Sequence, residues 1–299
     1  MNAKAILRQM REGDRPDGLT LRGFVDMYRA TGEKEYRDKV LECMDEIVSP
    51  DGQILSYEPD KALFGKVSFG NALFFAWDET GEERYRNALR QIREEITRLD
   101  EIGLPIKGLI DRSFQPFIIE YDNRFGDKQS YKYAAQFFQE QRQKLFDEKN
   151  QLFRYDFDIN TGRTNYHYLE LNGRILVALA DTIEQMDIQL YDHYRVLADL
   201  FLETVRGMMP FRLAGTELFS KEITDRDEPD IEGSLMVMYA LLKGVRLGLL
   251  DEEKYLPIAD NMRYCMEYLC DTLVCFAGFP GSFGIRLMVE AEIREAGLR

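Results

Sequence analysis

Residues 28–41 read YRATGEKEYRDKVL, and residues 77–90 read WDETGEERYRNALR. Both stretches contain an aromatic residue, then Thr-Gly-Glu, then a Tyr-Arg pair, and they lie 49 residues apart. In each, an apolar segment with helical spacing ends at a glycine, which tolerates the left-handed conformation of a helix C-cap, and an acidic cluster then opens the next segment. Each stretch therefore predicts two helices joined by a short turn.

The pattern recurs along the chain. Looser copies cover residues 121–131 and 248–255, and a second type of linker, at residues 49–57, resembles residues 147–155 and reads as a long loop. A helix pair every 45–50 residues or so fits about six times into the chain. We predict an all-α fold, an (α/α)6 barrel or six-hairpin toroid of about twelve helices, forming a single domain over residues 1–299. An open helical solenoid would show the same period.

Charge and composition exclude several classes of protein. The chain has 39 Lys and Arg against 53 Asp and Glu, a formal net charge of -14 at pH 7. This balance disfavours binding to nucleic acid or to an anionic membrane. No apolar run reaches the ~20 residues that a membrane span needs, and Met1 to Gly13 lacks the apolar stretch of a signal peptide. We therefore expect a cytoplasmic protein, with no nucleic-acid or membrane partner.

Histidine and cysteine are scarce. With two His and four Cys, the chain has too few of these residues for a His-rich metal site or a disulfide framework. We expect neither a metal nor another cofactor.

Several segments together resemble a known group of enzymes. They are GFVDMYRATG at 23–32, DGQI at 51–54, Asn-Gly at 172–173, EGS at 232–234 and KGVRLG at 243–248. In order and spacing they are similar to the unsaturated uronyl hydrolases of glycoside hydrolase families 88 and 105, most of all to the unsaturated rhamnogalacturonyl hydrolases of family 105. The resemblance covers most of the chain.

The resemblance implies a particular reaction. These enzymes hydrate the C4=C5 enol ether that a polysaccharide lyase leaves on a uronic acid. An aspartic acid protonates the double bond and activates water, and the resulting hemiketal opens to release the next sugar. Such chemistry needs a carboxyl group that exchanges a proton near neutral pH, and cations or donors for the sugar carboxylate.

The resemblance also implies catalytic residues. Asp111, in LIDRSFQPF at 109–117, is the counterpart of a family aspartate and would donate the proton; alternatively it caps the following helix. Asp158 and Glu170 are candidates for a second carboxylate, since glycosidic chemistry commonly uses two. Glu170 stands where the family has an arginine. Either carboxylate could equally be a solvated or ion-paired loop residue.

The candidates for substrate binding are cations, aromatic residues and amides in or near the family motifs. Lys66 replaces a family acidic residue, and Tyr155 replaces a family histidine. The cations could instead be surface partners in an acidic protein, and Trp77 could simply pack in the repeat. The full set is Lys66, Trp77, Arg112, Tyr155, His167, Tyr168, Asn172 and Arg174.

We therefore expect a hydrolase for a small, anionic oligosaccharide. One alternative is a catalytically degenerate sugar-binding or scaffold relative, favoured by Gly65-Lys66 in place of the family's acidic pair. Another is a sugar epimerase or isomerase, which normally needs paired histidines, whereas only His167 lies near a site motif.

Overall fold

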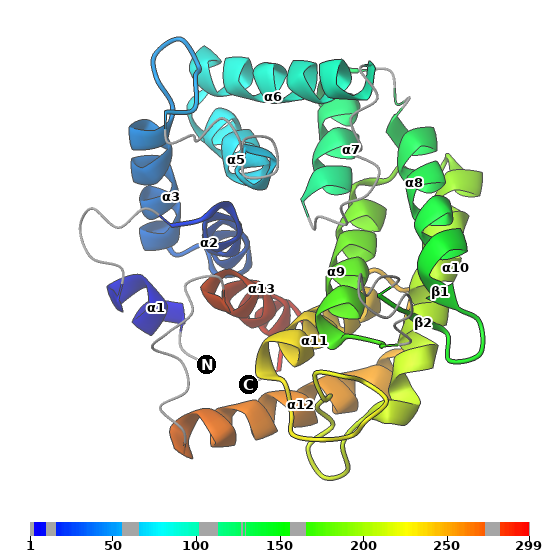
Figure 1. The fold of residues 1–299 in the computed structure, drawn as a ribbon. Coiled ribbons are helices and arrows are strands. Elements are labelled where there is room, and N and C mark those ends of the chain that lie inside the picture. The colour runs from blue at the N-terminus through cyan, green and yellow to red at the C-terminus, as the bar shows by residue number, and fades with distance from the viewer. Residues whose placement is uncertain are drawn as a thin grey trace, which may run out of the picture. The chain divides into compact units, whose positions relative to one another are not determined.

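The computed structural model describes residues 3–9, 16–55, 66–101, 113–126, 128, 130–155, 166–272 and 282–298. Nearly all elements in these residues are helices (Figure 1), so the all-α prediction is confirmed. The chain divides into two compact units, Met1–Leu109 with Ala277–Arg299 and Ile110–Phe276. No helix within the described residues is long and apolar enough to cross a membrane.

The first unit contains the two clearest copies of the repeat. Gly32 ends the first helix of one copy with a φ of 69°, and its N–H binds the carbonyl oxygen of Tyr28. Gly81 repeats this turn with a φ of 70°. The predicted helix pairs are therefore confirmed. The described helices of this unit are α1 (Ala3–Gln9), α2 (Gly18–Thr31), α3 (Lys34–Ile47), α5 (Gly70–Thr80), α6 (Glu83–Glu101) and α13 (Ser282–Glu295).

Helices α2 and α13 pack closely because each presents a glycine to the other. A Cβ at Gly23 would lie 2.5 Å from Cβ of Leu287, and one at Gly284 would lie 2.6 Å from the backbone carbon of Leu19. The second contact is the more restrictive, because backbone atoms cannot rotate away.

We expect Gly284→Ala to lower the free energy of unfolding. Alanine favours a helix over glycine by about 1 kcal/mol, but overpacking costs about 1–3 kcal/mol. Because the contact is with backbone atoms, we expect the overpacking cost to exceed the helix gain, and the net loss, up to about 2 kcal/mol, should appear as a lower urea midpoint. Glu295→Ala, at the exposed end of α13, is the control and should change stability by less than about 0.5 kcal/mol. An unchanged midpoint for Gly284→Ala would contradict this packing.

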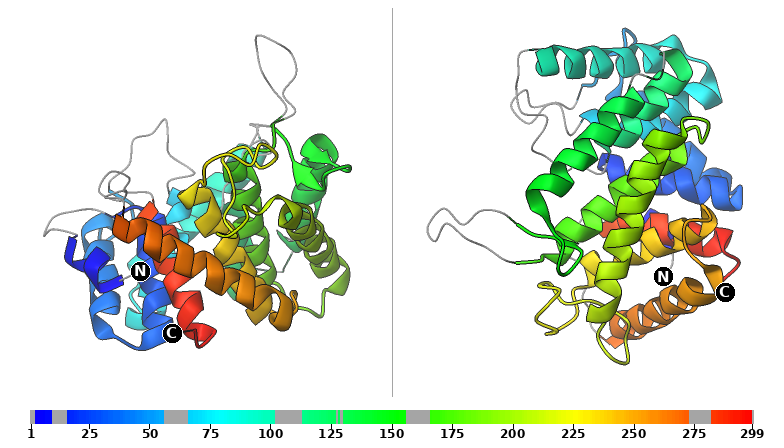
Figure 2. Two further views of the ribbon diagram at one scale, coloured as in Figure 1. Left: turned by 90° about the horizontal axis from the view of Figure 1, so that it is seen from below. Right: turned by 90° about the vertical axis from the view of Figure 1, so that its right-hand side faces the viewer.

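The second unit is built around α9, which packs against α7, α10 and α11. Figure 2 shows α8 and α10 side by side in the same unit. Its described elements are α7 (Phe114–Phe125), α8 (Ser130–Leu145), β1 (Phe146–Asp147), β2 (Leu152–Phe153), α9 (Leu169–Gln185), α10 (Tyr191–Met208), the 3-10 helix η3 (Met209–Phe211), α11 (Ile231–Arg246) and α12 (Glu252–Thr272).

In this unit, each looser copy of the repeat also lies between the two helices of a pair. Gly248, between α11 and α12, has the left-handed φ of 69°. Gly126, between α7 and α8, is instead extended, with a φ of -116°. There the turn is held by a side chain, because Asp122 accepts the N–H of Ser130 at 3.0 Å. A left-handed glycine is therefore not needed in that copy.

Candidate functional site

A short β-hairpin carries one wall of the candidate site. Strands β1 and β2 pair antiparallel, with Asp147 opposite Leu152. In the turn, Gln151 has a φ of 55°, and its N–H donates to the carbonyl oxygen of Asp147 at 2.7 Å. Gly207 of α10 allows the turn to approach, since a Cβ there would lie 2.2 Å from the Gln151 carbonyl oxygen. The predicted long loop at 147–155 is thus a tight hairpin at its start, because the turn closes on its own carbonyl group.

Two segments distant in the chain form the other wall. Tyr168, just before α9, makes an antiparallel bridge with Glu222. The N–H of Ile223 donates to the carbonyl oxygen of His167 at 3.0 Å. These backbone bonds bring the Glu222 carboxylate to the buried imidazole.

His167 lies between two carboxylates and is only 4% exposed. Its Nε2 is 3.1 Å from Oδ2 of Asp147, and its Nδ1 is 3.9 Å from Oε1 of Glu222. Neither Nδ1 of His167 nor Oε2 of Glu222, both buried, has a hydrogen-bond partner among the described residues. The protein therefore leaves hydrogen-bonding capacity at this point, which a ligand with hydroxyl groups could use.

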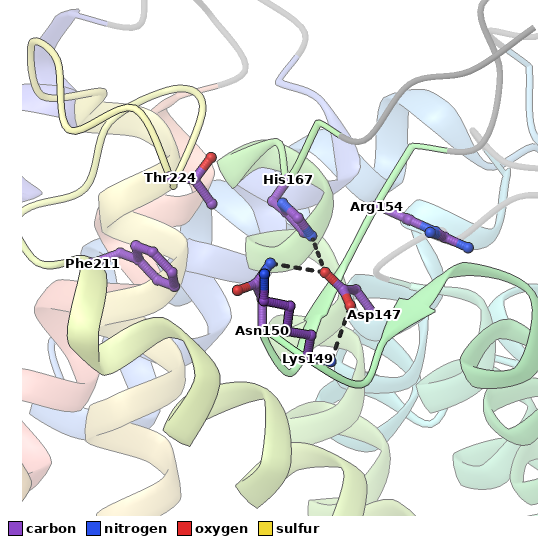
Figure 3. A pocket seen from close by; sticks show the side chains of 7 residues that line it. All are labelled: Asp147, Lys149, Asn150, Arg154, His167, Phe211 and Thr224. Carbon is purple, nitrogen blue, oxygen red and sulfur yellow. Dashed lines mark hydrogen bonds and ion pairs between the residues drawn. The ribbon is translucent and has the colours of Figure 1, made fainter.

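Asp147 is held as a carboxylate. Burial acts to raise its pKa, but hydrogen bonds from the backbone N–H of Lys149, the Asn150 amide and the His167 ring outweigh burial and lower the pKa. The amide of Asn150 donates to Oδ2 at 2.8 Å (Figure 3). Within the described part of the chain, no group of three His, Cys, Asp or Glu side chains is placed to hold a metal ion.

Two cavities have residues of this cluster in their walls. The first, of about 460 Å³, has His167 and Asp147 in its wall (Figure 3). The second, of about 770 Å³, has Glu222 and Tyr168 in its wall. We call the first the His167 pocket; it is lined by Asp147, Lys149, Asn150, Arg154, His167, Phe211 and Thr224. The second, here the Glu222 pocket, is lined by Tyr168, Ser220, Lys221, Glu222, Asp227 and Glu228.

Three tyrosine rings cluster around Tyr168, which lines the Glu222 pocket. The Tyr168 ring lies 6.1 Å from that of Tyr155 and 5.7 Å from that of Tyr166, measured between centroids. Tyr155 and Tyr166 are more than half exposed. Exposed aromatic faces beside carboxylates suit a sugar, whose ring packs on the aromatic face while its hydroxyls donate to the carboxylates.

Some predicted site residues already hold partners. Glu170 and Arg174 form an ion pair with each other one turn apart on α9. In the first unit, Nζ of Lys66 lies 2.8 Å from Oε2 of Glu95. These side chains have the charges expected for a binding site, but each is already in an ion pair with another side chain of the protein.

Asn172 and Trp77 have structural contacts. The Asn172 amide accepts the N–H of Phe153 and donates to its carbonyl oxygen, each at 2.8 Å, so it fastens β2 to α9. Trp77 is half-buried near the end of α5, with the Arg86 guanidinium 5.9 Å from its ring centre. Asp111, Arg112 and Asp158 lie outside the described residues. Their assigned roles stay predictions.

Sequence reasoning missed most of the two pockets. Asp147 and Glu222 were not singled out, although they flank His167. The resemblance between residues 49–57 and 147–155 does mark the linker that carries Asp147, Lys149 and Arg154. No sequence signal marks Glu222, because its position depends on a backbone bridge.

Comparisons with known proteins place this geometry in context. The model of Glycosyl Hydrolase Family 88 matches residues 3–266. A family 105 glycoside hydrolase from C. acetobutylicum ATCC 824 is 22% identical, with a TM-score of 0.79, over 93% of this chain and 92% of that chain. A family 88 glycosyl hydrolase from Bacteroides vulgatus is 14% identical, with a TM-score of 0.74, over 99% and 97%.

A third similar structure is a variant of an unsaturated glucuronyl hydrolase from Streptococcus agalactiae. It is 12% identical, with a TM-score of 0.57, over 96% of this chain and 81% of that chain. These structural likenesses show the fold, and the predicted (α/α)6 class is confirmed.

Proposed function

Because this chain belongs to glycosyl hydrolase family 88, we propose that it is an unsaturated uronyl hydrolase acting on a small anionic oligosaccharide. The observation that supports this proposal most strongly is the match of the family model over residues 3–266, a range that includes Asp111. Two sugar-sized cavities with carboxylates, cations and tyrosines in the second unit agree with a saccharide ligand.

The proposed reaction begins with proton transfer from Asp111 to C4 of the enol ether. The positive charge that develops at C5 is stabilised by the ring oxygen, and a water oxygen then bonds to C5 while its proton returns to the carboxylate. The hemiketal opens to a ketone, which frees C1 to release the next sugar. One carboxyl group can carry both proton transfers; Asp158 or Glu170 would be the second where two are used.

The proposed substrate is a disaccharide or short oligosaccharide with an unsaturated uronic acid at its end. The similar S. agalactiae variant is complexed with dGlcA-GalNAc6S, and we propose an anionic saccharide of this kind for the present chain. Other enzymes of polysaccharide degradation would supply it, and the chain would act in the cytoplasm as a single domain without a cofactor.

The direct test uses the ultraviolet absorbance of the enol ether. Purified protein should abolish this absorbance in at least one member of a panel of unsaturated disaccharides that differ in uronic acid and sulfation. In D2O the product should carry deuterium at C4, because the added proton comes from solvent. A panel left unchanged by the protein would refute the uronyl hydrolase proposal.

A noncatalytic sugar-binding relative is the second candidate. It is favoured by the ion pairs at two altered motif positions, Lys66 with Glu95 and Glu170 with Arg174. Such a protein would be stabilised against heat by a saccharide without consuming it.

A further inference from the structure

Three cations lie in or near the His167 pocket. Lys149 and Arg154 line the pocket, and the Arg226 guanidinium lies 6.0 Å from the centre of the Phe211 ring. No carboxylate among the described residues forms an ion pair with any of the three. The chain as a whole has 53 acidic against 39 basic residues, so carboxylates are in excess. Cations without a carboxylate partner make this pocket locally positive, although the chain as a whole is acidic.

The acidic residue next to Lys149 is drawn away from the pocket. Glu148 makes two hydrogen bonds with the guanidinium of Arg142, at 2.7 and 3.2 Å. Arg142 belongs to α8 and also binds Glu203, at 3.0 Å. Glu148 therefore pairs with Arg142, and the Lys149 ammonium forms no ion pair with a carboxylate in the described part of the chain.

The carboxylate inside the pocket is already compensated. Asp147 accepts the Lys149 N–H at 3.0 Å, the Asn150 amide at 2.8 Å and shares a hydrogen bond with His167 at 3.1 Å. The pocket lining therefore has two cations against this bonded carboxylate.

A second carboxylate, that of Glu222, lies beside the lining, because its Oε1 accepts the Thr224 hydroxyl at 2.8 Å and lies 3.9 Å from Nδ1 of His167. With the Arg226 guanidinium near Phe211 included, three cations stand against two carboxylates, so an incoming anion would meet net positive charge.

The rest of the lining suits a sugar ring. Phe211 offers an aromatic ring, and the Thr224 hydroxyl, which donates to Oε1 of Glu222 at 2.8 Å, can still accept a hydrogen bond. Nε of Arg154 and Nδ1 of His167 are buried and have no hydrogen-bond partner within the described residues. The pocket volume, about 460 Å³, lies within the usual range for small-molecule sites, about 300–1,000 Å³.

We propose that the His167 pocket binds the acidic group of a saccharide, a carboxylate or a sulfate. Arg154 and Lys149 hold the anionic oxygens, and Phe211 packs against the sugar ring. The choice of a saccharide rests on the proposed function, whereas the anion site itself rests on the unpaired cations.

The two histidines allow a direct test by NMR of the imidazole signals. His167 is in the pocket wall, and His193 lies near the start of α10, about 20 Å along the helix from its other end. Saturated methyl β-D-glucuronide is the probe, with neutral methyl β-D-glucoside as its match. N-acetylgalactosamine 6-sulfate, against N-acetylgalactosamine, tests the sulfate source. An acidic probe should shift His167 and not His193, with at least tenfold tighter binding than its neutral match.

Charge-removing variants make the test specific. Arg154→Gln should weaken binding of the acidic probe at least tenfold, and Arg154→Lys should restore part of it. Lys132→Gln, an exposed lysine on α8, is the control and should bind as the unaltered chain does. The site proposal is overturned when neither acidic probe moves His167, when the neutral sugars bind as tightly, or when Arg154→Gln binds normally.

The probes also separate this proposal from the hydrolase proposal, because saturated sugars cannot be hydrated. A chain that binds them but leaves every unsaturated disaccharide intact refutes the hydrolase alone. A chain that consumes an unsaturated disaccharide but shows no His167 shift refutes the pocket alone.

Discussion

An Asp111→Asn variant is expected to lose about a thousandfold in kcat on an unsaturated uronyl disaccharide, because general acid–base catalysis contributes typically 10²–10⁴-fold. Asparagine has nearly the size of aspartic acid but cannot give a proton to C4 or take one from water. Substrate binding should change little, so the loss should appear in kcat more than in KM. The rate of loss of the enol-ether absorbance measures both.

The controls separate catalysis from folding and from binding. Asp199→Asn, an exposed position on α10, should keep full activity. Asp111→Asn should still be stabilised against heat by the substrate, since the sugar contacts remain. An Asp111→Asn variant that keeps more than about a tenth of the activity would exclude Asp111 as the proton donor, because a lost general acid costs at least about a hundredfold.

The helix pairs could be predicted because their signals are local. The Thr-Gly-Glu turns contain both the glycine that ends one helix and the acidic residues that begin the next. Gly32 and Gly81 have nearly the same φ, 69° and 70°, as their shared sequence suggests. The pair Glu170 and Arg174 is local in the same sense, because residues four apart on a helix are neighbours.

The site could be predicted only in part, because its contacts are not local. His167 was selected for its place beside a motif, but its partners Asp147 and Glu222 reach it through a hairpin turn and a backbone bridge. Asn172 shows the opposite case. The motif suggested a ligand contact, whereas the structure uses its amide to fasten β2 to α9.

A buried ion cluster joins α11 to α9. Nζ of Lys243, on α11, lies 2.6 Å from Oδ1 of Asp181 and 2.6 Å from Oε2 of Glu184, both on α9. It also donates to the Tyr239 hydroxyl at 2.9 Å. The side chains of Lys243 and Asp181 are each only 2% exposed. Such a cluster is stable only while its charges are matched.

Lys243→Met is expected to reduce the free energy of unfolding by about 3–5 kcal/mol, because it leaves the Asp181 carboxylate buried without its cation. Urea unfolding near neutral pH measures the change. Arg246→Met is a matched control on the same helix. Arg246 pairs with Glu184 at a partly exposed position, where an ion pair contributes about 0–1 kcal/mol.

The same cluster makes the stability of the fold depend on pH. Burial acts to raise the pKa of Glu184, but the charges of Lys243 and Arg246 outweigh it and lower the pKa from 4.5 to about 2. Since the folded-state pKa lies below the unfolded one, this carboxylate adds stability that is complete above about pH 4.5 and is lost as the pH falls toward 2. The stability difference between the unaltered chain and Lys243→Met should therefore shrink when unfolding is measured at about pH 3.

A second substitution tests whether unmatched charge causes the loss. In Lys243→Met with Asp181→Asn, the amide can keep the hydrogen bond from Tyr239 while the buried negative charge is gone. This double variant should regain at least about 1 kcal/mol relative to Lys243→Met alone. If it regains nothing, or if Lys243→Met costs less than about 1 kcal/mol, the cluster does not hold α9 to α11 by its charges.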